Sequence, residues 1–392
     1  MRGARARPPA GPSGAIPFTR PAVTGRELDY LRQAVESGRL AGDGPFTQRC
    51  QGWLESRLGT AKALLTHSGT AALEMAAILC GLEPGDEVIM PSFTFVSTAN
   101  AVVLQRAVPV FVDIRPDTFN IDETRIEAAI TPRTRAIFVV HYGGVACDMD
   151  AIMDLARRHR LMVVEDAAHA ILAGYDGRPL GSFGDLAAFS FHETKNLISG
   201  EGGALAVNDP QLVERAEIIR QKGTNRNAFF RGQTDKYTWV DVGSSYLPGE
   251  LIAAFLLAQF DEAERLVAER TAVWQRYHTG FARLEEAGLL RRPVVVPRCR
   301  HNAHLYPLLM ADLPARSALI AHLQGLGIAA SFHYVPLHSS PAGRRFGRTG
   351  GSLAVTDDVA GRLLRLPLWS GMADQPEIVI DAIAGYFRML NR

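Results

Sequence analysis

The sequence predicts an α/β protein, with a large domain in which a mostly parallel sheet lies between helices and a smaller C-terminal α/β domain. Two patterns predict this fold class. Through residues 15–250, short apolar runs of strand length alternate with stretches of helical spacing, and this alternation is typical of parallel sheets covered by helices on both faces. A long helical pattern over residues 250–284 then leads into a shorter α/β stretch. We therefore expect a disordered extension over residues 1–14, the large domain over 15–250, and a linking helix with the small domain over 251–392.

Strands of the large domain are expected where apolar, often β-branched residues stand together in short runs. These runs are residues 63–65, 87–90, 108–113, 136–141, 161–164, 186–191 and 205–208. Helices are expected where apolar residues recur every third or fourth position. They are residues 25–37, 47–58, 71–80, 150–158 and 210–222, with a short helix inside 117–129 and one that begins near residue 97. In the small domain we expect a strand over residues 304–310 and a helix over 316–326.

The composition of the 392 residues is that of an ordinary globular protein, with 47% hydrophobic and 21% charged residues and a net charge of +1. Such a charge gives no bulk attraction to nucleic acids or to anionic membranes. The first 14 residues lack the apolar core of a secretory signal, and no apolar run reaches the roughly 18 residues of a membrane span. The cysteines form no CxxC pair, so we expect free thiols in a reducing cytoplasm, without disulfides or a zinc site. They are Cys50, Cys80, Cys147 and Cys299.

The most informative stretch is residues 185–203, where a lysine follows an expected buried strand. Lys195 comes four residues after the apolar run 186–191, and three glycines follow it. Desolvation in such surroundings lowers the pKa of an amine and makes it nucleophilic towards carbonyl carbons. The alternative is an ordinary loop lysine beside a glycine turn.

Asp166 adds a second group to this pattern. It stands just after the apolar run 161–164, 29 residues before Lys195, and ligand sites in open α/β sheets lie beyond the carboxyl ends of strands. A carboxylate in that place can pair with a pyridinium nitrogen, as it does in sites for pyridoxal phosphate (PLP). We therefore expect PLP chemistry, with Lys195 and Asp166 as the catalytic pair.

Three motifs resemble the fold-type I sugar aminotransferases of the DegT/DnrJ/EryC1/StrS family, and the resemblance extends from about residue 16 to the C-terminus. The motifs are Glu165-Asp166-Ala167-Ala168-His169, Ser190-Phe191-His192-Glu193-Thr194-Lys195-Asn196 and Gly200-Glu201-Gly202-Gly203. They are specific in combination and weak one at a time. The resemblance implies a fold-type I PLP-dependent aminotransferase that cycles between PLP and pyridoxamine phosphate (PMP). It also implies L-glutamate and 2-oxoglutarate as amino donor and product, and a nucleotide sugar as the other substrate.

The strand, turn and helix around Gly69 and Thr70 have the form of an anion site, because the first N–H groups of a helix are unpaired and its dipole favours negative charge. A capped helix start without a ligand is the alternative. The resemblance favours the PLP phosphate here and implies Ser190 as a further phosphate ligand. It also implies that Phe93 stacks on the pyridine ring and that His169 bonds the phenolic oxygen, whereas ordinary core packing is the alternative for both.

Residues 223–250 carry many polar and aromatic side chains with little periodicity, and long irregular stretches inside compact domains are usually functional. In the family this region reaches the partner subunit, which implies a homodimer with shared active sites; a tetramer is left open. The stretch 243–246 replaces the family's Gly-x-Asn-Tyr pattern, so that Ser245 stands in place of an asparagine that contacts the partner's phosphate. A serine hydroxyl can still donate one hydrogen bond there, directly or through water.

Four histidines of the C-terminal part raise the question of a metal site, namely His301, His304, His333 and His338. No two of them share a helix at i, i+4 spacing with a carboxylate, so we expect no metal. The resemblance places His333 and His338 near the nucleotide-sugar cleft, as polar contacts.

Several stretches are similar to one branch of the family, the dTDP-4-amino-4,6-dideoxygalactose transaminases. They are residues 40–44, 191–196, 223–226, 229–232, 235–239 and 243–246. The implied reaction moves an amino group from L-glutamate to C4 of dTDP-4-keto-6-deoxy-D-glucose and gives dTDP-4-amino-4,6-dideoxy-D-galactose. The alternative substrates are GDP-4-keto-6-deoxymannose and a 3-keto sugar. A sugar 3-dehydratase would carry histidine in place of Lys195, and a non-enzymatic PLP-binding regulatory protein would carry a DNA-binding domain, which is not found in this sequence.

Overall fold

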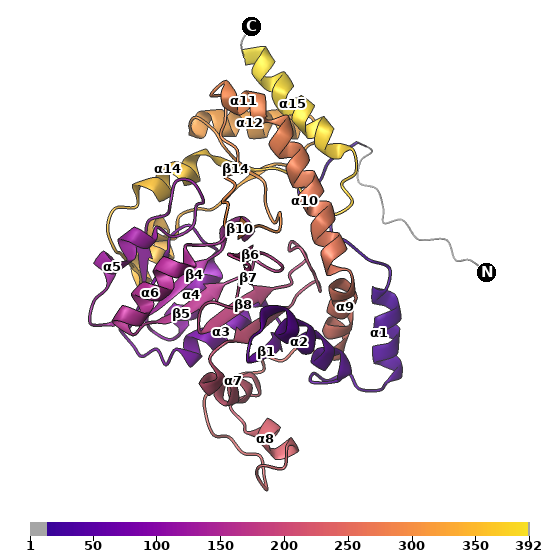
Figure 1. Cartoon of the computed structure of the whole chain (residues 1–392), viewed down its shortest axis with the longest axis vertical. Coiled ribbons are helices and arrows are strands. Elements are labelled where there is room, and N and C mark those ends of the chain that lie inside the picture. The colour runs from indigo at the N-terminus through magenta and orange to yellow at the C-terminus, as the bar shows by residue number, and fades with distance from the viewer. Residues whose placement is uncertain (1–13, 391–392) are drawn as a thin grey trace, which may run out of the picture.

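The computed structural model describes residues 14–390, and within them an eight-stranded sheet forms the centre of the molecule (Figure 1). Its spatial order is β1 (Lys62–Thr66), β9 (Gly203–Val207), β8 (Leu186–Ser190), β5 (Met162–Asp166), β4 (Thr134–Val140), β2 (Glu87–Pro91), β3 (Val108–Val112) and β13 (Arg348–Thr349). Neighbouring strands from β8 to β13 are parallel, whereas β9 runs antiparallel to β1 and β8. The predicted α/β fold with a mostly parallel sheet is confirmed. The extension predicted over residues 1–14 lies outside the described residues, apart from Gly14.

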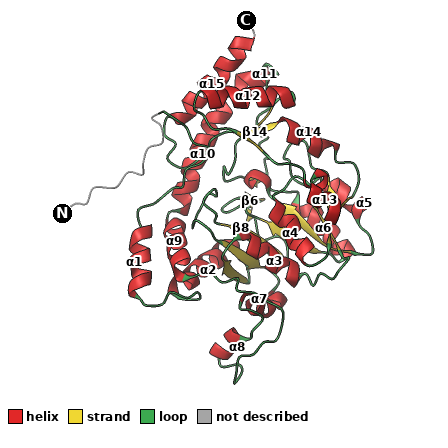
Figure 2. Cartoon of the chain, turned by 180° about the vertical axis from the view of Figure 1, so that it is seen from behind, coloured by secondary structure: helices red, strands yellow, loops and turns green. Residues whose placement is uncertain are grey.

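Helices cover both faces of this sheet (Figures 1 and 2). One face packs against α1 (Glu27–Glu36), α2 (Pro45–Leu58), α5 (Ile126–Ala129), α6 (Met149–His159) and α9 (Glu250–Asp261), and the other against α3 (Gly69–Leu79), α4 (Val96–Leu104) and α7 (Val213–Arg220). Strand β4 shows the alternation, because Ile137 and Val139 join the first core while Ala136 and Phe138 join the second. Successive side chains of a strand point to opposite faces, so a strand covered on both sides is apolar throughout.

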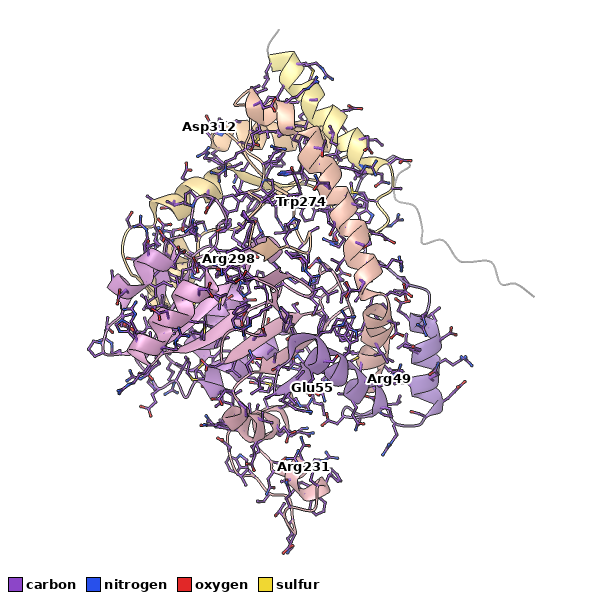
Figure 3. All side chains as sticks on the ribbon, in the orientation of Figure 1. Arg49, Glu55, Arg231, Trp274, Arg298 and Asp312 are labelled. Atoms are coloured by element: carbon purple, nitrogen blue, oxygen red, sulfur yellow. The ribbon has the colours of Figure 1, made fainter. Side chains whose placement is uncertain are left out.

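A separate core, here called the small core, lies beyond the end of the large sheet, at the top of Figure 1. There α10 (Ala263–Gly280), α12 (Leu313–Gly325), α14 (Ala354–Arg362) and α15 (Gln375–Leu390) accompany a three-stranded antiparallel sheet in the order β11 (Pro307–Leu309), β14 (Leu363–Arg365), β12 (Ser331–Phe332). Trp274 of α10, labelled in Figure 3, is buried in this core together with Tyr306 and Trp369.

Short elements complete the described chain. They are α8 (Arg226–Phe230), α11 (Ala282–Glu286), α13 (Pro341–Phe346), the single turns η1 (Glu123–Arg125), η2 (Tyr142–Gly144), η3 (Pro210–Leu212) and η4 (Leu337–Ser339), and the small strands β6 (Gly174–Tyr175), β7 (Arg178–Pro179) and β10 (Cys299–Arg300). The helix predicted over residues 250–284 is divided into α9, α10 and the start of α11. The strand predicted over 304–310 is shorter than expected, because only β11 pairs with β14.

The large sheet and the small core are connected through strand pairing as well as through the linking helices. Strand β13, from the C-terminal part, adds to the large sheet beside β3, and Ile16 pairs with Ile328 of the small core. The division of the chain at residue 250 stays a prediction.

The segment between α7 and α9 (residues 221–249), here called the projecting segment, extends away from the body of the molecule. Figures 1 and 3 show α8 and Arg231 near its tip. It contains little regular structure besides α8. Several of its large apolar side chains are exposed, namely Phe230, Tyr237, Trp239, Val240 and Val242. Of the helices within residues 14–390, none combines the length and the apolar character needed to cross a membrane.

Candidate active site

A cavity of about 390 Å³ lies where the carboxyl ends of β5 and β8 meet the small core. Seven of the ten predicted site residues line it, and they come from stretches far apart in the chain. These seven are Lys195, Asp166, His169, Ser190, Gly69, Thr70 and His333.

Lys195 is held by a tight loop between β8 and β9. The Phe191 N–H donates to the Gly202 carbonyl at 2.8 Å, and the Glu193 N–H donates to the Gly200 carbonyl at 2.8 Å. Gly200 has a φ of +81°, which glycine adopts without the steric cost of a side chain. These bonds fold the loop back on itself and fix the position of the Lys195 backbone at the edge of the cavity.

The surroundings of Lys195 favour its neutral form. Burial lowers the pKa of Lys195 to about 8, the carboxylate of Asp166 opposes this shift, and the guanidinium of Arg365 adds to it. At pH 7 about a tenth of the amine is then neutral. The neutral amine is the form that attacks a carbonyl carbon or accepts a proton.

Asp166 ends β5, the strand beside β8, and its side chain is buried. The Thr98 hydroxyl donates to one carboxylate oxygen at 2.8 Å, and the Ala168 N–H donates to the other at 3.1 Å. Burial raises the pKa of Asp166, while these two bonds and the charge of Lys195 lower it. Since Thr98 has a single proton to give, the Thr94 hydroxyl 2.9 Å away donates to Thr98 in turn. The carboxylate is thus oriented by a short chain of hydroxyls.

His169 lies against His304, with ring centroids 4.1 Å apart. The Gly143 N–H donates to Nδ1 of His169 at 3.3 Å, so the proton of the neutral ring is on Nε2. Burial, aided by nearby positive charges, holds the pKa of His169 well below its usual value. On the other side, Nδ1 of His304 lies 2.8 Å from the amide oxygen of Asn196, the residue after Lys195.

The start of α3 offers hydrogen-bond donors to an oxyanion. Ser68 caps the helix by accepting a backbone N–H at 3.0 Å, and the Thr70 hydroxyl lies 2.7 Å from that of Ser97. A Cβ on Gly69 would lie 2.8 Å from Cβ of Ser190, so glycine lets the start of α3 pack closely against β8 and brings the two residues together. A helix N-terminus flanked by hydroxyls has the chemistry of a phosphate site.

Phe93 does not line the cavity, contrary to the prediction. It is 1% exposed and packs in the joint between the large sheet and the small core, with its ring centroid 5.3 Å from that of Tyr142 and 5.4 Å from that of Tyr334. Phe95, two residues later, lines the cavity and is 58% exposed. The chain turns from β2 into α4 at this point, so the alternation of a strand does not decide which phenylalanine faces the cavity.

His338 lies outside the lining of this cavity, and its place near the nucleotide-sugar cleft stays a prediction. Its Nδ1 is 2.8 Å from the Ser92 hydroxyl and its Nε2 is 3.4 Å from Asp357, so it ties the turn η4 to the end of β2. His333 does line the cavity, with Nδ1 3.0 Å from the Tyr142 hydroxyl.

Ser245 is exposed on the projecting segment and is paired with Gln221. Its predicted contact belongs to a partner subunit, so it stays a prediction. Within residues 14–390, no three or more His, Cys, Asp or Glu side chains are arranged to hold a metal ion.

Several cavity residues were not predicted from the sequence. They are Phe18, Phe95, Arg270, His304, Tyr334 and Arg365, and Thr98, which is not in the lining but bonds to Asp166, was not predicted either. A sequence signal existed for Arg365, because it is a charged residue inside the apolar run 363–366. The others carry no signal of that kind, because their roles depend on contacts between distant parts of the chain.

Comparison with known proteins identifies the family. The model of the DegT/DnrJ/EryC1/StrS aminotransferase family matches residues 21–384. The spore coat polysaccharide biosynthesis protein SpsC of Bacillus subtilis is 37% identical over 380 residues, which cover 94% of this chain and 96% of SpsC. GDP-perosamine synthase of Caulobacter vibrioides is 35% identical over 361 residues, which cover 92% of this chain and 94% of that enzyme.

The fold is similar to that of solved structures in the same group. The PLP form of Spr1654 from Streptococcus pneumoniae has a TM-score of 0.86 at 27% identity, and the match covers 94% of this chain and 97% of that one. Because the family model spans most of the chain and the full-length relatives exceed 30% identity, the chain belongs to the DegT/DnrJ/EryC1/StrS aminotransferase family, whose members depend on PLP.

Proposed function

We propose that this aminotransferase moves an amino group from L-glutamate to C4 of dTDP-4-keto-6-deoxy-D-glucose and gives dTDP-4-amino-4,6-dideoxy-D-galactose. The observation that carries the proposal is the meeting of Lys195, whose pKa is lowered, with the buried Asp166 in one cavity. The choice of the dTDP sugar is supported by the six stretches similar to that branch of the family. We place the reaction in the cytoplasm, because the four cysteines are free thiols.

The cavity residues fit PLP. The phosphate would bind at Gly69, Thr70 and Ser190, where the close approach of Gly69 to Ser190 brings the start of α3 against the end of β8. Asp166 would pair with the pyridinium nitrogen, and Nε2–H of His169 would donate to the phenolic oxygen. Lys195 would hold the cofactor covalently.

Phe95 replaces Phe93 as the residue proposed to cover one face of the ring. It is the phenylalanine of this turn that lines the cavity, and aromatic side chains stack favourably on planar rings. Phe93 instead supports the joint behind it.

PLP, when bound, supplies a protonated pyridine ring that takes up the electron pair left when a Cα proton departs. Burial raises the pKa of Asp166, and its bonds from Thr98 and Ala168 favour the ionised form against that burial. In this form the carboxylate would hold the proton on the ring nitrogen. The neutral Nζ of Lys195 would take the proton from Cα of the amino donor and, as an ammonium, deliver it to the C4′ carbon of the cofactor. The second reactant, a keto sugar, receives the amino group by the same proton movements in reverse.

A GDP-linked 4-keto-6-deoxymannose is the second candidate substrate. GDP-perosamine synthase shares 35% identity over 92% of this chain, and its name supports a GDP sugar. A 3-keto sugar nucleotide has no comparable support among these relatives.

We also propose a homodimer in which the projecting segment completes the partner's site. Its exposed large side chains, Phe230, Tyr237 and Trp239 among them, form an apolar surface of the kind that is usually covered by another protein. Ser245, on the same segment, would donate to the partner's phosphate. Analytical ultracentrifugation of the wild type and of Trp239→Ala tests the assembly, and a wild type that stays monomeric contradicts it.

The function is tested by incubating the purified protein with L-glutamate and either dTDP-4-keto-6-deoxy-D-glucose or GDP-4-keto-6-deoxymannose. Mass spectrometry and NMR of the product identify the amino sugar and its configuration at C4. We expect an amino sugar only from the dTDP substrate, and none with Lys195→Ala. Product from the GDP sugar alone supports the second candidate, and turnover by Lys195→Ala at the wild-type rate refutes the assignment of the lysine.

A further inference from the structure

Arg365 is a charged residue in the middle strand of the small sheet. Its strand, β14, lies between β11 and β12. The flanking Leu364 and Leu366 are buried in the small core, whereas Arg365 lines the cavity with Lys195. The alternation of the strand therefore directs one guanidinium out of the apolar core and into the site.

The guanidinium keeps unused hydrogen-bond donors. Nη2 donates to the Phe332 carbonyl at 3.0 Å, but Nε is buried and has no partner among the described residues. No carboxylate in the described part of the chain is close enough to offset the burial that lowers the pKa of Arg365. The guanidinium is thus buried with only one hydrogen bond given to the described residues, and this costs free energy unless a ligand accepts from its remaining donors.

Arg270 lines the same cavity but has a structural role, because its guanidinium is bonded to backbone carbonyls. Its Nε donates to the Ala303 carbonyl at 3.2 Å and its Nη2 to the His304 carbonyl at 2.8 Å. These two bonds hold the backbone beneath His304. Arg365 has one such bond, so its fork is mostly free to bind something else.

Two contacts hold the Arg365 guanidinium in place. Besides the Phe332 carbonyl, the ring of Phe18 lies against it, with the guanidinium carbon 4.7 Å from the ring centroid. The segment that carries Phe18 is fixed in turn, because the Ile16 N–H donates to the Gly327 carbonyl at 2.9 Å. A guanidinium positioned in advance loses less entropy when it binds a ligand.

Two acidic side chains of the described residues line the cavity. Asp166 accepts from Thr98 and Ala168, and Glu201 lies 3.7 Å from His192. The charge of Asp166 acts on Lys195, whereas no carboxylate of the described residues offsets the burial of the Arg365 guanidinium. Arg365 is therefore the cation that suits an anionic reactant.

We propose that Arg365 binds an oxyanion of the reactants, and that the α-carboxylate of the amino donor is the first such group. This inference rests on the proposed function, since it assumes those reactants. A guanidinium fork matches a carboxylate or a phosphate through two parallel hydrogen bonds, so the diphosphate of the nucleotide sugar offers the same chemistry. The α-carboxylate is favoured because Arg365 is near enough to Lys195 for its charge to affect the amine, and the α-carboxylate is joined to the carbon that bears the reacting amino group.

The test compares Arg365→Gln with Arg362→Gln in the holoenzyme. Arg362 is a matched control, because its guanidinium donates to the Met310 carbonyl and to Asp358 and does not line the cavity. The two half-reactions are followed separately through the visible absorbance of the cofactor. The donors are L-glutamate, its 1-amide, which lacks the α-carboxylate charge, and L-glutamine, which lacks the γ-carboxylate charge.

We expect Arg365→Gln to raise the KM for L-glutamate by about 10- to 100-fold, as the loss of a charge-assisted bond implies, and to leave the KM for the 1-amide nearly unchanged. Arg365→Lys should recover part of the loss, and Arg362→Gln should behave as the wild type. In a measurement independent of turnover, 2-oxoglutarate should raise the melting temperature of the PMP form less in Arg365→Gln than in the wild type. If only the KM for the nucleotide sugar rises, the oxyanion bound is the diphosphate.

The inference is overturned if Arg365→Gln leaves the KM values of both reactants unchanged, or if it lowers only kcat. If the proposed function is wrong, the wild-type enzyme itself will not use L-glutamate or the dTDP sugar and will accept other reactants instead. This result differs from a change seen only in Arg365→Gln. The comparison of Arg365→Gln with Arg362→Gln would still be made with the reactants that the wild type accepts.

Discussion

The lowered pKa of Lys195 should be visible in how fast the apo-protein captures PLP. Only the neutral amine attacks the aldehyde carbon, so the capture rate should rise with pH and level off above the pKa of the lysine. Burial places that pKa at about 8, whereas a lysine in water titrates near 10.4. The rate should therefore level off more than about two pH units earlier than for an exposed lysine.

The size of the effect follows from these two values. A difference of about 2.4 units corresponds to roughly 3 kcal/mol in favour of the neutral amine. At pH 7 about one Lys195 in ten is neutral, compared with about one in 2,500 for a lysine in water. Lys195 should therefore capture PLP roughly 200-fold faster than a lysine with the pKa of an exposed side chain. Asp166→Asn removes a charge that opposes the shift and should move the midpoint below 8, whereas Arg365→Gln removes a charge that adds to it and should move the midpoint up.

Stopped-flow absorbance measures this rate when apo-protein is mixed with PLP at a series of pH values. Lys195→Ala is the control and should show no covalent phase. A wild-type midpoint near 10 would refute the argument from burial. An upward shift in Asp166→Asn would refute the role assigned to the carboxylate.

Three further substitutions test the cavity. Gly69→Ala should weaken PLP binding by about tenfold or more in an equilibrium titration, because the new Cβ meets Ser190 at 2.8 Å; Gly52→Ala, with nothing within 4 Å, is its control, and equal affinities contradict this phosphate site. Thr98→Val removes the 2.8 Å bond to Asp166, which should raise the pKa of the carboxyl and move the acid limb of kcat/KM to higher pH, with Thr98→Ser restoring it. Lys195→Met should raise the free energy of unfolding of the apo-protein by up to about 3 kcal/mol at pH 7. That gain should vanish above about pH 10.4, where lysine is neutral in both states; urea melts at both pH values check it.

The sheet and two residues of the candidate site, Asp166 and Lys195, could be predicted from the sequence because both predictions depend on local patterns. Strands covered by helices on both sides are apolar throughout, and such runs are visible in any window of five residues. Asp166 and Lys195 stand out because charged groups follow those runs directly. Their nearness could not be read from the sequence in the same way, because it depends on the pairing of β5 with β8, in which Asp166 lies opposite Ala188.

The positions of Phe93 and His338 outside the cavity lining share a physical cause, because both depend on contacts between distant segments. Phe93 and Phe95 have the same local pattern, and the choice between them is made by Tyr142 and Tyr334, which pack against Phe93. His338 is bound by Ser92, far away in the chain. Strand β13 has only two residues, too few to form a periodic pattern.

The histidines around Lys195 are neutral, so the positive charge that an anionic reactant meets in the cavity comes from other side chains. Burial holds the pKa values of His169, His304 and His333 well below their usual value, so these rings donate and accept hydrogen bonds without adding charge. When Lys195 is neutral, Arg365 is the cation with unused donors on the described cavity wall, while Arg270 is engaged with backbone carbonyls. Its charge does not change between the half-reactions, because a guanidinium stays protonated. One fixed cation can therefore meet the carboxylate of the amino donor first and an oxyanion of the sugar nucleotide afterwards.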